Sequence, residues 1–435
     1  MKQPGLIRDI ALVLVLAATG VPSFAEQSAG GDSIWTRDKL TGDWLGGRTY
    51  LSDHGIDLGL RLSYYGQRVS SGGRDQNGEW GGTMDYRLNI DGKKLFGTWD
   101  GLSFNLHART RRGKDVLADA GAMTMPNTGM LMPLPGDYHG TALTGFTVNQ
   151  MFPLGEEHLG MATLGKLDIL DAVTLFFPSV GYGQEGFWNV NALVSALPWF
   201  GAVNGLSLYG GWLATINKEY QLGQSAILIT GTENVTTTTG TLSDSFHDGY
   251  WLAAFHRFFY KLGDKPGYFM VFGGFSTRDQ APNDPNDFVF KPGQGIEDTD
   301  EEKPWDIALY RSQVFWQAGE DSNRKATLLI GGTAGPDNPQ FAQYNFFTAV
   351  EGYGLMASRP HDRMGVSAWH NWLSDDFKDL VSPVADLQDT WGFELYYNYQ
   401  VIPSVHLTAD IQFVQNEWRD DDVAVIPGVR LVMDF

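Results

Sequence analysis

The chain has 435 residues, with 53 glycines, no cysteine and a formal net charge of -20 at pH 7. The lack of cysteine excludes disulfide scaffolds, thiol catalysis and cysteine-type zinc sites, and the strong negative charge argues against nucleic acid as a partner. No Pro-, Ser- or charge-rich linker divides the chain, which favours one large repetitive architecture over several domains.

The first 25 residues have the pattern of a secretory signal peptide. Basic residues precede an apolar run from Ile10 to Ala18, and Ser23-Phe24-Ala25 offers a small-x-small cleavage site. The run is too short to cross a bilayer as a helix. We therefore expect residues 1–25 to be removed on export.

Residues 26–56 are the only part of the expected mature chain that is more typical of helix than of strand. Asp43 can cap the start of a helix, and Gly55 is placed where a helix usually ends. We expect a short N-terminal helical segment here, followed by one domain over residues 57–435.

Three consecutive segments between residues 57 and 112 alternate polar with apolar side chains. A period of two residues places successive side chains on opposite faces of a strand. Such strands separate two different environments, as in a sandwich or in a barrel that crosses a membrane. The polar sets are Asp57, Gly59, Arg61 and Ser63, then Thr83, Asp85, Arg87, Asn89 and Asp91, then Ser103, Asn105, His107, Arg109 and Arg111.

Sixteen segments are expected to be strands, an even number that suits a closed transmembrane barrel. Long connections at 113–141, 216–245, 278–304 and 374–389 contrast with tight turns elsewhere, and aromatic residues gather at strand ends. Residues 224–231 are either a further strand or part of a long loop. The fold class expected is all-β, a transmembrane antiparallel β-barrel of about 16 strands with a short N-terminal periplasmic helix. The expected strands lie near 57–68, 81–95, 101–112, 142–152, 159–166, 185–197, 204–215, 246–258, 266–277, 305–317, 325–333, 345–358, 363–373, 390–400, 404–415 and 422–435.

The last expected strand, Val423 to Phe435, alternates apolar residues with polar or small ones and ends on an aromatic residue. Terminal residues fray unless a sheet holds them, and in a closed barrel the final strand pairs with the first. Pro427 is the exception in this strand, since it has no N–H to donate to a neighbour.

Residues 39–58 are K-L-T-G-D-W-L-G-G-R-T-Y-L-S-D-H-G-I-D-L. This segment resembles the opening of the carbohydrate-selective porins of the OprB family, which has Leu-Thr-Gly-Asp-Trp-Gly-Gly, an Arg-containing helix and a Gly-Ile. Leu45 stands where the family usually has its first glycine. Residues 164–168 (L-G-K-L-D), 393–400 (F-E-L-Y-Y-N-Y-Q), 407–410 and 428–431 are similar to further family segments, so the resemblance covers essentially the whole mature chain.

The resemblance implies a sixteen-stranded porin in the outer membrane of a Gram-negative bacterium. It implies passive, carbohydrate-selective diffusion of monosaccharides such as glucose into the periplasm. The implied partners are small sugars, outer-membrane lipid and lipopolysaccharide, and the barrel assembly machinery, which would recognise Phe435. Porins of this size often form homotrimers.

Polar strand faces that turn inward would line a wet channel. Arginine can bind two vicinal hydroxyls, carboxylates can accept from others, and an aromatic ring can stack on a pyranose. Binding should be weak, because a channel must release its solute. The alternative is that these charges simply pair with one another along the wall. The candidate pore-lining residues are Arg61, Asp85, Arg87, Asn105, His107, Arg109, Arg111, Lys166, Glu394, Tyr396, Asp410 and Arg430, with Lys166 included through the resemblance.

Two groups of loops have open roles. Loop 113–141 is a candidate for folding inward to narrow the pore, or else for an external cap. The acidic runs, such as residues 297–302, are expected in solvated loops, with calcium binding or bridging to lipopolysaccharide as the alternative.

Motifs for catalysis are lacking in the sequence. It has no G-x-S-x-G elbow, H-E-x-x-H motif or phosphate-binding loop, and His361, His370 and His406 lack metal-ligand spacing. We therefore predict no enzyme activity, no metal and no cofactor. Two alternatives stay open, an anion or acidic-sugar porin and a secreted all-β polysaccharide-binding protein or glycosidase.

Overall fold

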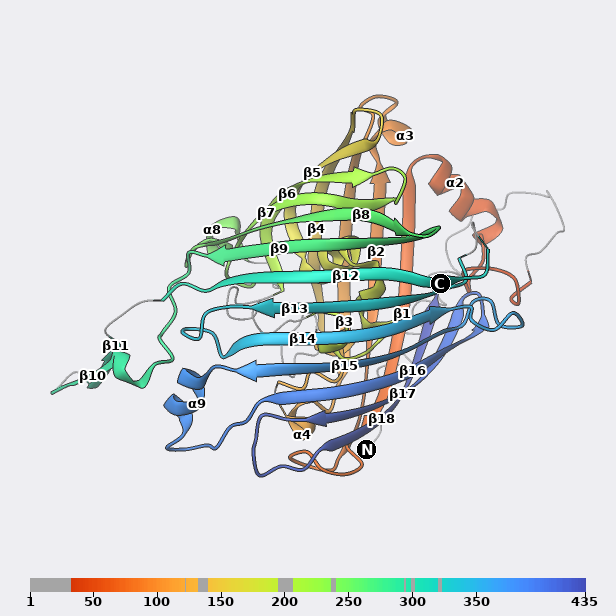
Figure 1. The fold of residues 1–435 in the computed structure, drawn as a ribbon. Helices are drawn as coiled ribbons and strands as arrows, with labels where there is room; N and C mark the ends of the chain where they lie inside the picture. The colour runs from red at the N-terminus through yellow and green to blue at the C-terminus, as the bar shows by residue number, and fades with distance from the viewer. Residues whose placement is uncertain are drawn as a thin grey trace.

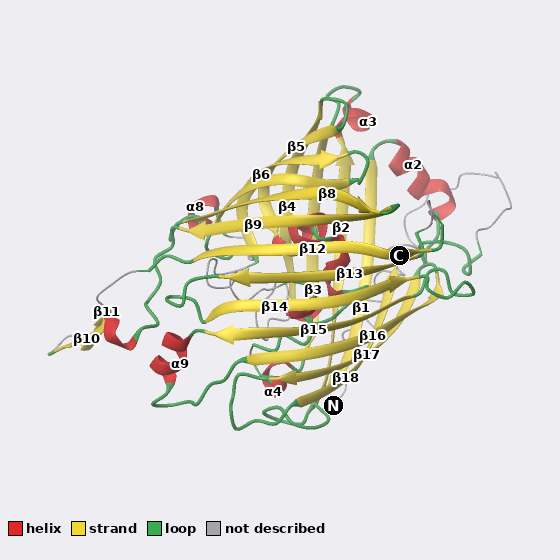
Figure 2. Cartoon of the chain, viewed as in Figure 1, coloured by secondary structure: helices red, strands yellow, loops and turns green. Residues whose placement is uncertain are grey.

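Within the described residues of the computed structural model, sixteen strands form one closed antiparallel barrel (Figure 1 and Figure 2). The structure describes residues 33–121, 123–131, 140–194, 206–235, 240–292, 295–298, 302–319 and 323–435. The expected signal peptide, residues 1–25, lies outside them. The expected fold class is confirmed.

Each barrel strand pairs with its neighbour in the sequence, and β1 pairs with β18 to close the ring. The one interruption is a separate hairpin of β10 (Phe288–Lys291) and β11 (Gly295–Asp298), which leaves β9 paired with β12. The barrel strands are β1 (Ile56–Arg68), β2 (Gly78–Asp91), β3 (Leu102–Gly113), β4 (Gly140–Leu154), β5 (His158–Asp168), β6 (Ser207–Asn217), β7 (Leu222–Gly231), β8 (Tyr250–Leu262), β9 (Lys265–Ser276), β12 (Trp305–Gln317), β13 (Lys325–Ala334), β14 (Ala342–Tyr353), β15 (Arg363–Leu373), β16 (Thr390–Ile402), β17 (Val405–Gln415) and β18 (Ala424–Asp434).

One predicted strand is wrong, and one segment that the sequence left open is a strand. Residues 185–194 of the predicted strand 185–197 contain no strand and lie inside the barrel, where their apolar side chains pack against its inner wall. Residues 222–231 instead form β7, with Ile227 and Ile229 exposed on the outer face. The predicted number of sixteen strands is nevertheless correct, because the missing strand and the additional strand β7 compensate for one another.

The two ends of the barrel differ in the length of their connections. Turns such as 155–157, 263–264 and 403–404 join strands at one end, and the long loops lie at the other. In Figure 1 the arrowheads of β9, β13 and β15 point to the long-loop end, where α8, α9 and the β10–β11 hairpin lie. In outer-membrane barrels the short turns are periplasmic and the long loops extracellular.

The helices are all short. None of the described helices is long and apolar enough to cross a membrane. They are η1 (Trp44–Gly46), α2 (Gly47–Asp53), α3 (Gly92–Phe96), α4 (Leu117–Ala120), α5 (Thr128–Leu131), α6 (Ile169–Phe176), η2 (Pro178–Gly183), η3 (Val190–Ala192), α8 (Leu242–Ser245), η4 (Pro285–Asp287) and α9 (Asp375–Val381).

In residues 33–56, the described part of the expected helical segment 26–56, the structure has the short helices η1 and α2. The N-cap residue of α2 is Gly46, and the Asp43 side chain instead reaches the third residue of the helix: its Oδ1 accepts hydrogen bonds from the backbone N–H of Thr49 (2.7 Å) and from the Thr49 hydroxyl (2.9 Å). Gly55 follows the helix with φ +82°, a conformation that favours glycine. Leu45 also lies in the left-handed region, with φ +59°.

The outer face of the barrel is apolar, as expected for contact with lipid. Leu164 is 69% exposed and Leu213 is 64% exposed, and both point away from the lumen. The inner face differs from the expectation of a uniformly polar wall. On β1–β3 and β14–β18 it carries charged and polar side chains, whereas on β6–β9, β12 and β13 it is largely apolar, with Trp251, Phe255 and Phe272 buried. Both faces of these strands are apolar because protein, rather than water, covers the inner one.

Replacing Leu45 with glycine should stabilise the N-terminal segment. The left-handed backbone costs a non-glycine residue about 1–2 kcal/mol, and the added flexibility of glycine costs about 0.5–1 kcal/mol. The relief of strain should therefore exceed the entropy cost by a small amount. Leu45 is 92% exposed, so little packing is lost. Amide hydrogen exchange of residues 43–49 should slow about twofold.

The matched control is Gly46→Ala. Gly46 has φ +92°, and an added Cβ meets nothing within 4 Å, so this change introduces backbone strain without a clash. Exchange in the same residues should accelerate. Faster exchange in Leu45→Gly would contradict the assignment of strain to Leu45.

Candidate functional site

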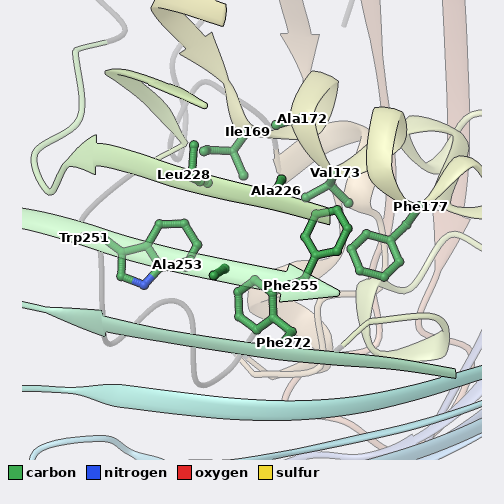
Figure 3. Close-up of a pocket in the computed structure, with 11 residues that line it drawn as sticks. Ile169, Ala172, Val173, Phe177, Ala226, Leu228, Trp251, Ala253, Phe255 and Phe272 are labelled. Atoms are coloured by element: carbon green, nitrogen blue, oxygen red, sulfur yellow. The ribbon is translucent and has the colours of Figure 1, made fainter. Parts of the chain in front are cut away.

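The lumen is occupied by residues 169–194, called here the inward segment, which connect β5 to the loop before β6. The segment begins with α6, whose start is capped by Asp168: its Oδ1 accepts from the backbone N–H of Leu170 at 2.9 Å. Figure 3 shows how α6 and the residue after it face the apolar inner wall. The residues that meet there are Ile169, Ala172, Val173 and Phe177 from the inward segment and Ala226, Leu228, Trp251, Ala253, Ala254, Phe255 and Phe272 from β7–β9.

This apolar contact leaves a cavity of only about 30 Å³. A space of that size has room for about two waters, and its walls offer almost no polar partner for them. The contact is therefore a packed core within the barrel rather than a path for solute, and it fixes the first half of the inward segment.

Buried charges on the opposite wall hold the second half of the inward segment. The Glu394 carboxylate accepts from the backbone N–H of Trp188 (2.6 Å) and of Asn189 (3.0 Å). Arg430 donates to the carbonyl oxygens of Gly183 (2.7 Å) and Gly186 (3.0 Å). Neither side chain is exposed. Two predicted sugar-binding residues therefore bind the protein's own backbone.

Glu185 of the inward segment joins two strands through ion pairs. Its Oε1 lies 2.7 Å from Nη1 of Arg61 on β1, and its Oε2 lies 3.3 Å from Nη1 of Arg363 on β15. Arg61 also pairs with Asp434 at 2.8 Å, and Arg363 with Glu351 at 3.1 Å. The Glu185 side chain is 41% exposed, so this charge faces the water of the lumen.

Tyr396 lies beside this chain of ion pairs but is almost completely buried. Its hydroxyl donates to Glu351 Oε1 at 2.7 Å, and its ring meets that of Phe187 edge to face at 4.8 Å between centroids. The predicted stacking of Tyr396 on a sugar would require the inward segment to move away, because Phe187 already covers the ring.

A second buried cluster gathers Asp85, His107 and Arg109, all predicted from strand parity. Asp85 accepts from Arg109 Nε at 2.6 Å and from Gln184 Nε2 of the inward segment at 2.8 Å, and lies 2.8 Å from His107 Nε2. The other ring nitrogen of His107, Nδ1, lies 3.3 Å from Asp168 and 3.0 Å from Asp171.

The remaining predicted residues are dispersed around the barrel. Arg111 pairs with Asp115 at 3.1 Å, and Asp410 accepts from Gln412 at 3.0 Å. Arg87 lies opposite His107 on neighbouring strands, and Asn105 is exposed between Asn89 and Thr147. Lys166 is buried opposite Phe146, whose exposed side chain belongs to the outer face.

Sequence reasoning missed Glu185 and Trp188 because it placed them in a strand, and it missed Gln184 because that residue lies just before the predicted strand. The signal that could have corrected this is the run G-Y-G-Q-E-G at 181–186, since three glycines in six residues favour a loop over a strand. Arg363 and Glu351 were missed for another reason. They lie at strand ends, where parity arguments are weakest.

Loop 113–141 also reaches into the lumen in its described part. The carbonyl oxygen of Pro126 accepts from Gln67 (3.0 Å) and Gln412 (2.9 Å), and the backbone N–H of Thr128 donates to the Trp188 carbonyl at 2.7 Å. This loop therefore supports the inward segment from its extracellular side.

Below the inward segment a cavity of about 500 Å³ opens toward the short-turn end. Its volume is in the range of small-molecule sites, about 300–1,000 Å³. Three tyrosines, several hydroxyl and amide groups and the Glu351–Arg363 pair line it. The lining residues are Pro178, Ser179, Tyr220, Gln221, Leu222, Tyr268, Ser312, Val314, Asn323, Lys325, Thr327, Leu329, Glu351, Gly352, Tyr353 and Arg363.

The turn between β14 and β15, which borders this cavity, is fixed by Asp362. Burial works against its charge, but hydrogen bonds from Arg359, Tyr397 and the Gln400 backbone outweigh burial and lower the pKa of the Asp362 carboxyl group. The ionised Asp362 carboxylate thus links the turn to β16 through Tyr397 and the Gln400 backbone.

The chain is similar to known proteins in sequence over residues 270–435 and in fold over most of its length. Residues 270–435 match the family model described as carbohydrate-selective porin, OprB family. The high-pH structure of Pseudomonas putida OprB superposes with a TM-score of 0.77 at 16% identity, over 93% of this chain and 100% of that chain. The low-pH structure of the same protein gives a TM-score of 0.55 at 14% identity, over 92% and 99%. No curated protein sequence matches the chain.

At these identities the structural likeness establishes the fold, and the family model carries the sequence relationship. The matched family is one of porins, and the shared fold agrees with the closed barrel and its apolar outer face. The chain has the fold of a Gram-negative outer-membrane porin, and its residues 270–435 match the carbohydrate-selective porin, OprB family.

Proposed function

We propose that the chain is a passive diffusion pore for monosaccharides such as glucose, and that sugars pass through the cavity below the inward segment. The observation that carries this proposal is the composition of the cavity wall. Tyr220, Tyr268 and Tyr353 offer ring faces for the apolar side of a pyranose, and the pair of Glu351 and Arg363 offers a hydrogen-bond acceptor and donors for its hydroxyls.

The buried charges do not serve as sugar ligands in this proposal. The inward segment hydrogen-bonds to Glu394, Arg430 and Asp85. These residues therefore hold the inward segment, which narrows the lumen, in place. A sugar meets only the partly exposed groups around Glu185 and Arg363. We expect weak binding, because few polar groups remain to hydrogen-bond to the sugar and because a pore must release its solute.

The partners inferred from the sequence remain part of the proposal. Phe435 is buried, and its backbone N–H donates to the Leu60 carbonyl at 2.9 Å, so the terminal aromatic completes the barrel seam once folding ends. Recognition by the assembly machinery would have to precede that step. Homotrimer formation and contact with lipopolysaccharide are further expectations for the intact membrane. The proposal includes no catalytic step.

Liposome swelling tests the proposed function. Vesicles that contain the purified porin should swell rapidly in glucose, and faster than in neutral amino acids of similar size. The same rate for both solutes would reject carbohydrate selectivity. No swelling with either would reject the pore itself.

Replacing Tyr353 with alanine should weaken sugar binding in the pore. Loss of the ring removes roughly 40 Å² of apolar contact, worth about 1 kcal/mol or about fivefold in affinity. The block of ion current by glucose in planar bilayers measures this affinity. Tyr344→Ala is the matched control, because Tyr344 lies on the same strand but is exposed on the outer face. An equal effect of both changes would contradict a sugar contact at Tyr353.

An anion or acidic-sugar pore is the second candidate, because Arg363 and Lys325 lie in the cavity wall. Glu185 opposes it, since its partly exposed carboxylate lies between Arg61 and Arg363. Reversal potentials in a salt gradient distinguish the two. Strong anion selectivity of the wild-type pore would favour the second candidate.

The change Glu185→Gln should shift ion selectivity toward anions. It removes one negative charge from the lumen and leaves both arginines, and one charge a few ångströms from the path changes the ion energy by roughly 0.5 kcal/mol in water. The chloride-to-potassium permeability ratio should rise about twofold. Asp100→Asn, at an exposed ion pair with Lys93 on a turn, should leave it unchanged. An unchanged ratio in Glu185→Gln would place the ion path away from Glu185.

A further inference from the structure

His107 has carboxylate oxygens on both of its ring nitrogens. Nε2 lies 2.8 Å from Asp85 Oδ1. Nδ1 lies 3.1 Å and 3.0 Å from the two oxygens of Asp171 and 3.3 Å from Asp168 Oδ2. Three oxygens of two carboxylates therefore converge on a single ring nitrogen.

A single N–H group cannot satisfy all three oxygens. One hydrogen makes one well-aligned bond, and ionised carboxylates offer only acceptors. Asp168 Oδ2 has no hydrogen-bond partner among the described residues, although the side chain is completely buried. An unsatisfied buried carboxylate oxygen is costly, so this arrangement points to a cation that several atoms can bind at once.

We propose that His107, Asp168 and Asp171 bind a divalent transition-metal ion, with Zn²⁺ as the best probe. The ligand atoms of these residues all lie within 4.8 Å of one another. Zn²⁺ takes imidazole nitrogen and carboxylate oxygen at about 2.0–2.2 Å, so neighbouring ligand atoms stand about 3.0 Å apart at 90° and about 3.4 Å apart at the tetrahedral angle. The spacings from Nδ1 to the carboxylates, 3.0 and 3.3 Å, match those edges.

The surroundings of His107 suit a metal ligand. With Nε2–H donating to Asp85, a metal would take the lone pair of Nδ1, and a carboxylate behind the ring is the usual arrangement for a ligating histidine. Arg109 and Gln184 in turn hold Asp85 in place. The Asp171 side chain is 36% exposed, which gives an ion access from the lumen and leaves room for water as a further ligand.

The position of the site gives it a consequence for the pore. His107 belongs to β3, Asp168 caps α6 and Asp171 lies in the first turn of α6. A bound ion would therefore tie the start of the inward segment to the barrel wall. This inference concerns the fixing of that segment and does not depend on which solute the pore conducts.

The test is metal binding by the intact, detergent-solubilised porin after treatment with EDTA. Calorimetric titration with Zn²⁺, and the visible absorption of Co²⁺ as a second readout, should show about one ion per chain. Asp171→Asn should weaken binding at least 100-fold, because it removes a ligand. Asp85→Asn should weaken it about 10- to 100-fold, as expected for a partner behind the ligating histidine. Heat-modifiable migration on gels checks that each variant is folded.

Asp115→Asn is the matched control, since it removes a carboxylate from another ion pair of the same strand region, with Arg111. Its Zn²⁺ affinity should equal that of the wild type. Absence of uptake by the wild-type protein would overturn the proposal. Unchanged affinity in folded Asp171→Asn would overturn it as well. Should Asp171→Asn fail to fold, His107→Gln takes its place with the same expected loss.

Discussion

The lumen of this porin depends on the anchoring of the inward segment from two opposite sides. Apolar packing of α6 and Phe177 against β7–β9 fixes one side, and buried charges from β1, β2, β16 and β18 fix the other. Ordering a backbone residue costs about 1–2 kcal/mol, so no single contact could hold a segment of this length. Two kinds of interaction on two walls also fix its position across the pore, which neither could do alone.

The buried charges that hold the inward segment are tolerable because they meet specific partners in it. Glu394 receives two backbone N–H groups, and Arg430 donates to two carbonyl oxygens. Hydrogen bonds to charged groups contribute about 1.5–3 kcal/mol each, whereas an unpaired buried charge is strongly destabilising. The charges therefore specify one position of the segment, because a shift along the wall would leave them without partners.

The anchoring of the inward segment determines which charged residues of the lumen can meet a solute. Fully buried groups such as Arg109 and Glu394 have no access to solute and maintain the constriction. Partly exposed groups such as Glu185 and Arg363 remain for the solute and for ions. Charged residues of the same types therefore hold the inward segment where it buries them and remain accessible to solute where it leaves them partly exposed.

The sequence by itself determined the barrel, because the alternation of polar and apolar side chains along a strand can be recognised from neighbouring residues alone. It placed Arg61, Asp85 and Arg430 on the inner face, and each contacts residues of the inward segment. Only the tertiary structure decided what these side chains bind. Arg61 binds Glu185, which lies 124 residues away in the sequence, and Arg430 binds the Gly183 carbonyl, 247 residues away. Asp85 binds Gln184, 99 residues away. Strand parity carries no information about a loop that folds back into the lumen. For the same reason the approach of Asp168 and Asp171 to His107 could not be read from spacing, since strand pairing and the cap of α6 bring them together.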